Sequence, residues 1–258
     1  MVFVIQQESL LCIRKCKKRF LLNDKNYVFL FFPKNINRIA VELLNKIAFK
    51  MDNNQQAYNM WADQYDTNKN KTRDLEGMAL RQVLSPISFE NALEIGCGTG
   101  KNSEWLITQA ERVVAVDFSD EMLNKAKEKV KSPKIQFQKA DITEGWSFTN
   151  QTFDLISFSL VLEHIQDIDF IFKQIDSKLR TGGHVYIGEL HPFKQYQGSL
   201  ARFDTEGGRV ELDCYTHNIS EFLGLAKTYG LTLIQLEEWF DEDDKTTVPR
   251  ILTLLFQK

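Results

Sequence analysis

Three glycines within five positions mark the segment where ligand chemistry is easiest to place. Gly96, Gly98 and Gly100 follow the apolar run Asn91–Ile95 and precede a stretch with helical spacing. Glycine lets a turn tighten and lets a ligand approach the backbone, and the helix start that follows offers free N–H groups. We therefore expect a ligand-binding loop between a strand and a helix, with a plain connecting turn as the competing interpretation.

The glycine spacing separates this loop from two common nucleotide-binding motifs. The order is G-x-G-x-G, preceded two positions earlier by the acidic Glu94. A nicotinamide fingerprint reads G-x-G-x-x-G, and a phosphate loop continues into G-K-[ST], which is absent here. The spacing therefore disfavours a nicotinamide oxidoreductase and excludes a phosphate loop.

Two further acidic residues come at the ends of expected strands. Asp117 closes the buried run 112–116, where a doubly wound fold uses a carboxylate to accept hydrogen bonds from ribose hydroxyls. Asp141 and its neighbour Ile142 follow the third expected strand. A carboxylate there can accept from an exocyclic amine while the apolar side chain covers an aromatic base. Taken singly, each acid is also typical of an ordinary helix start or loop.

The elements that must position these residues alternate between strands and helices. Hydrophobic periodicity indicates strands at 91–95, 112–116, 134–138, 153–157 and 184–188, and helices at 53–67, 74–84, 101–109, 119–131 and 167–179. The tail adds a helix at 220–229 and two strands, at 232–238 and 249–257, joined as an antiparallel pair. The pattern predicts an α/β fold: a Rossmann-like, doubly wound, seven-stranded sheet, mostly parallel, with one antiparallel strand near the C-terminus.

Composition narrows the class of protein. Apolar residues make up 43% of the 258-residue chain and charged residues 26%, which excludes a wholly disordered chain. No apolar run approaches the roughly 20 residues of a membrane helix. Four unevenly placed cysteines indicate a reducing compartment, and we expect a cytoplasmic protein.

Charge is distributed unevenly along the chain. Residues 1–50 carry ten Lys/Arg against three Asp/Glu, a net charge of +7, whereas residues 51–258 carry 22 against 32, a net charge of −10. Nucleic-acid binding needs clustered basic residues, so the negative net charge of residues 51–258 argues against a nucleic-acid partner.

The first fifty residues differ from the rest in other ways. They contain the basic cluster Arg14–Arg19 and the apolar patch Tyr27–Phe32, but no glycine. Neither a secretory signal nor a transit peptide fits them. We interpret 1–50 as a basic extension that is not native or is disordered, either an appendage or upstream read-through. Residues 51–258 then form one domain, and we expect no metal site.

Together, these motifs resemble those of a known family. Glu94-x-Gly96-x-Gly98-x-Gly100, Asp117, Asp141 and the segment Leu179–Gly183 resemble the class I S-adenosylmethionine-dependent methyltransferases over about residues 55–257. The similarity is greatest to the small-molecule, type 11-like branch, which includes quinone and biotin-pathway enzymes. The resemblance implies an enzyme that transfers the methyl group of S-adenosyl-L-methionine to a small molecule by in-line displacement.

The resemblance also implies roles for individual residues. Gly96 and Gly98 of the Gly96–Gly100 loop would lie against the methionine part of the cofactor, and Glu94 would orient its amino group. Asp117 would hold the ribose diol. The adenine would lie against four side chains: Phe118, Met122, Asp141 and Ile142.

An aromatic helix precedes these motifs. Tyr58, Trp61 and Tyr65 resemble the N-terminal helix that covers the cofactor in this family, with core packing as the alternative.

The methyl acceptor has no such motif. A base assists if the nucleophile is a hydroxyl, a thiol or an acidic C–H, and His164, His191 and His217 are candidates, each with a structural role as the alternative. No D-P-P-Y, N-P-P-Y or Pro-Cys motif of DNA methyltransferases occurs, which favours a small acceptor. The aromatic and cationic segment Leu190–Cys214 suits a carboxylated or aromatic acceptor, or is a solvated hairpin. The acidic run 237–244 is interpreted as a solvated turn.

Two other functions stay open at this stage. A non-catalytic protein that binds S-adenosylmethionine for regulation would keep the same motifs, and a nicotinamide oxidoreductase is the less favoured enzyme class. Nothing in the sequence indicates the oligomeric state.

Overall fold

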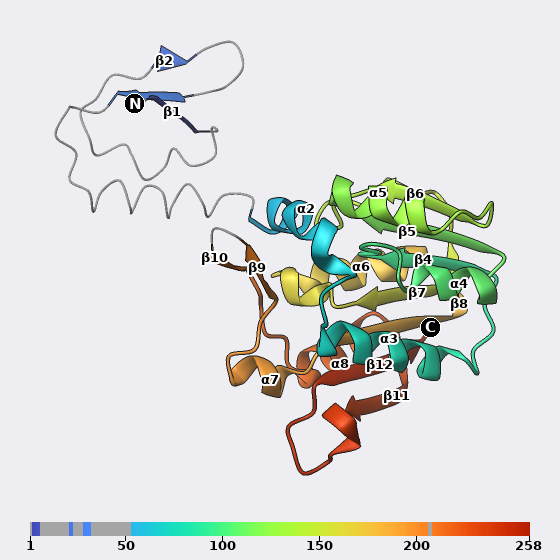
Figure 1. The fold of residues 1–258 in the computed structure, drawn as a ribbon. Helices are drawn as coiled ribbons and strands as arrows, with labels where there is room; N and C mark the ends of the chain where they lie inside the picture. Colours follow the sequence, from blue (N-terminus) through green and yellow to red (C-terminus); the bar gives the residue numbers. More distant parts are fainter. Residues whose placement is uncertain (1, 6–20, 23–27, 32–52, 206–207) are drawn as a thin grey trace. The chain divides into compact units, whose positions relative to one another are not determined.

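The computed structural model describes residues 2–5, 21–22, 28–31, 53–205 and 208–258 (Figure 1). The chain divides into two compact units, Met1–Asn53 and Asn54–Lys258. In the first, β1 (Val2–Ile5), β2 (Leu21–Leu22) and β3 (Val28–Phe31) form an antiparallel sheet in the order β1-β3-β2. The interpretation of 1–50 as a non-native or disordered extension falls largely on residues outside the described ranges, and it stays a prediction.

The second unit is built on a seven-stranded sheet in the order β11-β12-β8-β7-β4-β5-β6. Only β12 runs against its neighbours, because it pairs antiparallel with both β8 and β11 while every other pair is parallel. The predicted fold class is therefore confirmed. The strands are β4 (Asn91–Ile95), β5 (Arg112–Asp117), β6 (Ile135–Lys139), β7 (Phe153–Ser159), β8 (Leu179–Leu190), β11 (Thr232–Trp239) and β12 (Ile251–Gln257).

Helices cover both faces of this sheet (Figure 1). On one face, α3 (Lys71–Leu84), α4 (Ser103–Gln109) and α5 (Asp120–Lys129) bury apolar side chains against one set of strand residues. On the other face, α6 (Ile168–Lys178) and α8 (Ile219–Thr228) do the same. Strands buried on both faces explain why the central runs are apolar throughout rather than alternating.

Side-chain caps decide where several helices begin. Ser119 Oγ accepts from the Met122 amide at 3.1 Å, so α5 begins where the sequence places it. The Asn70 carboxamide accepts from the Arg73 amide at 3.0 Å. That cap starts α3 at Lys71, three residues before the predicted start.

The Gly182–Gly183 pair would be expected to end the preceding helix, but it does not. Helix α6 ends at Lys178, and both glycines lie inside β8, where the register with β7 shifts. A Cβ atom on Gly183 would lie 2.9 Å from the Arg180 carbonyl oxygen, so the irregular strand needs glycine there.

The segment between β8 and α8, named the roof, lies over the carboxyl ends of the strands. It contains α7 (Pro192–Tyr196) and the hairpin of β9 (Arg202–Thr205) and β10 (Gly208–Glu211). Phe203 of the hairpin stacks on Trp61 of α2 (Asn53–Tyr65), with ring centroids 5.0 Å apart. Two short 3-10 turns, η2 (Leu162–His164) and η3 (Asp241–Asp243), complete the unit. Within the described ranges, no helix has the length and apolar character needed to cross a membrane.

Asp154 ties together three strands of the sheet. Its carboxylate accepts from the backbone amides of Glu90 and Asn91, at 3.2 and 2.8 Å, and pairs with Arg180 at 2.8 Å. Burial opposes ionisation, but the hydrogen bonds from Asn91 and Arg180 hold the pKa of Asp154 below its ordinary value.

We expect Asp154→Asn to lower the free energy of unfolding at pH 7 by about 1.5 kcal/mol, as for hydrogen bonds to a charged group. A carboxyl group with a lowered pKa stabilises the fold above its unfolded pKa of about 4 and loses that effect as the pH falls through its folded pKa. Urea unfolding of both proteins between pH 3 and 7 should therefore show a difference that shrinks towards pH 3. A difference independent of pH would contradict this account.

Candidate functional site

A cavity of about 190 Å³ lies at the carboxyl ends of the central strands. It sits where the strand order reverses beside β4, the position at which open α/β sheets bind ligands. Most of the residues predicted to bind the cofactor line it together with one predicted base: Tyr65, Gly96, Gly98, Asp117, Phe118, Met122, Asp141, Ile142 and His164.

The three glycines are required for different reasons. All have positive φ angles, of +67°, +53° and +80° in chain order. A Cβ atom on Gly96 would lie 2.2 Å from a methyl carbon of Val161, and one on Gly100 would lie 3.2 Å from Cβ of Ala126 in α5. A Cβ atom on Gly98 would meet nothing within 4 Å. Gly98 thus faces open space in the cavity, whereas Gly100 packs against a helix and does not line the cavity.

Asp117 at the end of β5 anchors the glycine loop. One carboxylate oxygen accepts from the Gly98 amide at 2.8 Å and the other from the Ser119 amide at 2.9 Å. Burial raises the pKa of Asp117, and these hydrogen bonds act against that rise. A carboxylate has about four acceptor positions, so the side chain can still accept from a ligand in the cavity.

One end of the cavity is an apolar slot with a carboxylate beside it. Met122 and Ile142 are buried, and Phe118 and Ala140 complete the apolar lining. The exposed Asp141 accepts from the amide and the hydroxyl of Thr143, at 2.9 and 2.6 Å. A flat base with an exocyclic amine matches this combination.

At the other end, a smaller chamber of about 40 Å³ shares Tyr65, Gly96 and Gly98 with the main cavity. Two buried carboxyl groups line it. Burial raises the pKa of Glu94 to about 8, although Ser103 donates to it at 2.5 Å. Burial also raises the pKa of Glu76 to about 7, although Tyr186 and Asn102 donate to it. Glu94 therefore faces this chamber and not the main cavity.

Arg73, together with Lys101, supplies positive charge to the chamber and is not among the site residues predicted from the sequence. Its guanidinium lies 5.2 Å from the centre of the Tyr65 ring and donates to the Asn68 carbonyl oxygen at 2.8 Å and to Asp74 at 3.3 Å. Its remaining terminal nitrogen, Nη1, is buried with no hydrogen-bond partner among the described residues. A buried donor without a partner costs free energy unless a ligand supplies an acceptor. The only sequence signal is its place three residues after the capping Asn70.

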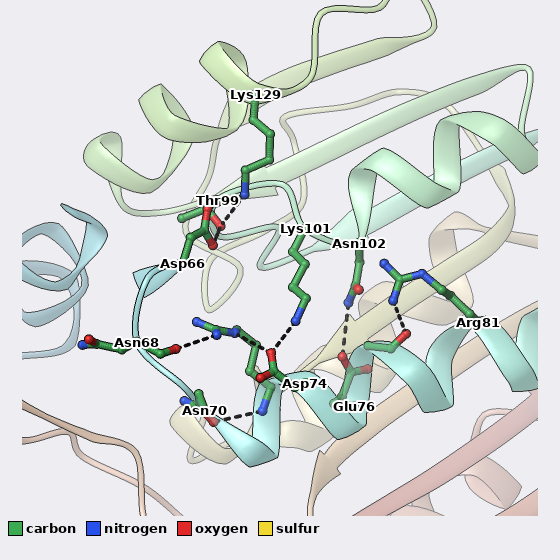
Figure 2. A network of polar contacts seen from close by, with 12 residues as sticks. Asp66, Asn68, Asn70, Asp74, Glu76, Arg81, Thr99, Lys101, Asn102 and Lys129 are labelled. Atoms are coloured by element: carbon green, nitrogen blue, oxygen red, sulfur yellow. Dashed lines mark hydrogen bonds and ion pairs between the residues drawn. The ribbon is translucent and has the colours of Figure 1, made fainter. Parts of the chain in front are cut away.

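A network of polar contacts joins the segment between α2 and α3 to the glycine loop (Figure 2). Asp66, just after α2, accepts from Thr99 of the glycine loop at 2.7 Å and pairs with Lys129 of α5. Lys101 of the same loop pairs with Asp74 of α3 at 2.6 Å. The segment between α2 and α3 is thereby held against the glycine loop.

The aromatic residues of α2 divide between two roles. Tyr58 and Tyr65 line the cavity, whereas Trp61 is buried against Phe203 in the roof. Tyr58 and Tyr65 thus lie where the predicted cover over the site would be, whereas Trp61 follows the alternative of core packing.

The three candidate bases lie in different places, and only His164 lines the cavity. His191 accepts from the Phe193 amide as the cap of α7 and lies 3.0 Å from Glu238. His217 contacts the Ile165 carbonyl oxygen at 2.8 Å and Glu221 at 3.2 Å. These contacts give His191 and His217 structural partners outside the cavity.

Comparison with known proteins agrees with the fold. The family model for the methyltransferase domain matches residues 93–187. Demethylmenaquinone methyltransferase from Bacteroides fragilis is 32% identical over 113 residues, 42% of this chain and 46% of that protein. Ubiquinone biosynthesis O-methyltransferase from Pelagibacter ubique is 27% identical over 121 residues, 47% of this chain and 50% of that protein. The chain thus spans about half the length of these curated relatives.

A solved structure extends the likeness in fold over most of the chain. The N-methyltransferase NodS from Bradyrhizobium japonicum, in complex with S-adenosyl-L-homocysteine, has a TM-score of 0.59 and 20% identity. The match covers 80% of this chain and 99% of that one. Residues 93–187 therefore match a methyltransferase domain, and the chain has the fold of the class I S-adenosylmethionine-dependent methyltransferases.

We expect alanine at the three glycines to separate packing from ligand space. Gly96→Ala and Gly100→Ala should each lower the free energy of unfolding by about 1–3 kcal/mol, because backbone strain adds to a close contact. Gly98→Ala should lower the free energy of unfolding by only about 1 kcal/mol, because the added Cβ strains the left-handed backbone but meets no neighbour. Denaturant unfolding of the three variants measures this order, and equal losses at all three positions would refute it.

Proposed function

We propose that the protein is an enzyme that transfers a methyl group from S-adenosyl-L-methionine to a small-molecule acceptor. One observation carries the proposal: an apolar slot flanked by Asp117 and Asp141 continues into a chamber holding Glu94 and Arg73. The order of these binding surfaces along the cavity matches a nucleoside joined to an amino acid. The methyltransferase-domain match over residues 93–187 supports it.

The residues present fit the cofactor part by part. The slot of Phe118, Met122 and Ile142 would hold the adenine, with Asp141 accepting from its amine. Asp117 would accept from the ribose hydroxyls. Gly98, which leaves open space beside its backbone, would lie against the methionine chain.

The two ends of the amino acid would meet opposite charges. Glu94 would accept from the ammonium group, and the unpartnered Nη1 of Arg73 would donate to the carboxylate. Glu94, which accepts from Ser103, would gain a cationic partner, and Arg73 Nη1 would gain an acceptor that the described residues do not provide.

The chain's contribution to the reaction is mainly positioning. The bound cofactor supplies a methyl group already activated by its sulfonium charge. The cavity would hold an acceptor atom in line with the sulfur–carbon bond, and such alignment can lower the barrier by several kcal/mol. Helix α2 and the roof built around Phe203 would exclude water from the reacting atoms.

The composition supports two finer proposals. The net charge of −10 over residues 51–258 favours a small acceptor over nucleic acid. The free cysteines Cys97 and Cys214 suit a reducing compartment, so we propose a cytoplasmic location.

Thermal unfolding with S-adenosylhomocysteine, 5′-methylthioadenosine and NADH tests the proposal directly. A ligand at 100 times its dissociation constant adds about 2.7 kcal/mol to the free energy of unfolding. We expect stabilisation by the first two and none by NADH. A response to NADH alone would refute the proposed cofactor class, whereas cofactor binding without methyl transfer to any acceptor would favour a regulatory binding protein.

We expect Arg73→Met to discriminate between two ligands. S-adenosylhomocysteine carries the amino-acid carboxylate and should bind about 10–100-fold more weakly, as for a lost hydrogen bond to a charged group. 5′-Methylthioadenosine lacks that carboxylate and should bind within about twofold of the original chain. Arg81→Met is the matched control, since Arg81 lies in the same helix and donates to the Gly77 carbonyl oxygen. Equal weakening of both ligands in Arg73→Met would contradict the assignment.

We expect the affinity for S-adenosylhomocysteine to rise from pH 6 to 8. The pKa of Glu94 is raised to about 8, so the ligand-free carboxyl group is largely protonated below that pH and must ionise to accept the ammonium group. Calorimetry in buffers of different ionisation enthalpy should show proton release below pH 8. Glu94→Gln should flatten the profile, and Glu104→Gln, an exposed acid of α4, should not. A rise that survives in Glu94→Gln would assign the titration to Glu76.

A further inference from the structure

A chain of polar contacts crosses the cavity wall opposite the glycine loop. The Tyr58 hydroxyl of α2 lies 2.8 Å from Nε2 of His164, and Nδ1 of His164 lies 2.9 Å from the Asp213 carbonyl oxygen. Tyr58 and His164 both line the cavity. The cofactor roles proposed above use neither of them.

The carbonyl contact determines which imidazole nitrogen carries the proton. A carbonyl oxygen only accepts hydrogen bonds, so Nδ1 of neutral His164 must be the donor to Asp213. Nε2 then has a free lone pair and accepts from the Tyr58 hydroxyl. Asn54 keeps the carbonyl in place, because its carboxamide donates to the Asp213 oxygen at 3.1 Å and accepts from the Asp213 amide at 2.9 Å.

The surroundings disfavour a negative charge on Tyr58. Burial, with Tyr65 and Glu163 nearby, raises the pKa of Tyr58 well above its ordinary value, so the hydroxyl stays protonated. The buried Glu163 places a carboxyl oxygen 3.9 Å from Nε2; burial raises the pKa of Glu163, and a positive charge on His164 would lower it. The other groups near Nδ1 of His164 are the Asn54 carboxamide nitrogen, at 3.4 Å, and the Cys214 thiol, at 3.8 Å, whose pKa burial raises to about 12.

We propose that Tyr58 and His164 form a proton relay that deprotonates a hydroxyl or thiol acceptor as it is methylated. The proposal rests on the proposed function and adds to it the class of acceptor. Tyr58 is the group that touches the acceptor, and His164 takes the proton through it. Glu163 and the Asp213 carbonyl are positioning groups that orient the imidazole and stabilise its charge.

Atoms and charges balance in a single step. The acceptor X–H gives its proton to the Tyr58 oxygen while the Tyr58 proton moves to Nε2 of His164. The electron pair on X forms the bond to the methyl carbon, and the pair of the breaking sulfur–carbon bond stays on sulfur, which becomes a neutral thioether. The positive charge thus passes from the sulfonium to the imidazolium, which returns its proton to solvent through Tyr58 after product release.

Nitrogen NMR of the full chain tests the resting state without any acceptor. We expect His164 in the Nδ1–H form with an unprotonated Nε2 between pH 7 and 8, and the same form in Tyr58→Phe because the Asp213 contact remains. A predominant Nε2–H form would overturn the relay, since Nε2 would have no lone pair for the tyrosine proton.

Methyl transfer to two probes tests the chemistry. Catechol is protonated at neutral pH and needs a base, whereas 4-nitrothiophenol is already ionised and does not. Tyr58→Phe and His164→Gln should each slow transfer to catechol by about 100-fold or more, the usual contribution of general base catalysis. Transfer to 4-nitrothiophenol and affinity for S-adenosylhomocysteine should stay within about threefold. His184→Gln, at a histidine that does not line the cavity, is the matched control and should leave both rates unchanged.

The pH dependence of kcat/KM tests the catalytic role of His164, because a purely structural role would leave that dependence unchanged. For catechol, kcat/KM of the original chain should fall at acid pH, and His164→Gln should lose that limb. Equal slowing with both probes, or retention of the limb, would overturn the relay. An original chain that binds S-adenosylhomocysteine but methylates neither probe would overturn the acceptor class and leave the cofactor site standing. Failure to bind S-adenosylhomocysteine would instead overturn the proposed function itself.

Discussion

The bond between the Asp117 carboxylate and the Gly98 amide is the contact on which the rest of the site depends. It joins the end of β5 to the loop after β4, so two neighbouring strands present their ligand groups at a fixed separation. The loop can make this contact only because its glycines adopt positive φ angles. Gly96 then passes close to Val161, and Gly100 lets α5 pack against the loop. The open space beside Gly98 remains as the place for a ligand.

Buried charge concentrates around that loop and is the basis for proposing that the site binds a zwitterionic ligand part. Glu76, Glu94 and Asp117 all have raised pKa values because burial removes their carboxyl groups from water. Arg73 is buried on the same side with one unpartnered nitrogen. Such an arrangement is costly in the ligand-free chain. An amino acid with its ammonium and carboxylate groups would satisfy both signs at once, so part of the binding free energy would come from removing this cost.

The roof connects cofactor enclosure to acceptor chemistry. Stacking of Phe203 on Trp61 joins the β9–β10 hairpin to α2, and the Asn54 carboxamide binds the Asp213 backbone at the same junction. Tyr58 and Tyr65, on one helix, consequently face two different parts of the cavity wall. Tyr58 lies beside His164, and Tyr65 lies beside Arg73. If the proposed roles hold, a change in how α2 packs would alter cofactor affinity and proton transfer together.

The sequence by itself determined the sheet, the antiparallel β12 and the acids that end the strands, because hydrophobic period and glycine spacing are local properties of the chain. It also indicated the ligand loop, since three glycines in five positions have few other uses. Only the tertiary structure decided which side chains meet across long separations. Arg73 lines the chamber because α3 packs beside the glycine loop, and His164 rather than His191 or His217 lines the cavity because η2 follows β7 at the switch point. Those contacts join residues tens of positions apart, and no spacing along the chain encodes them.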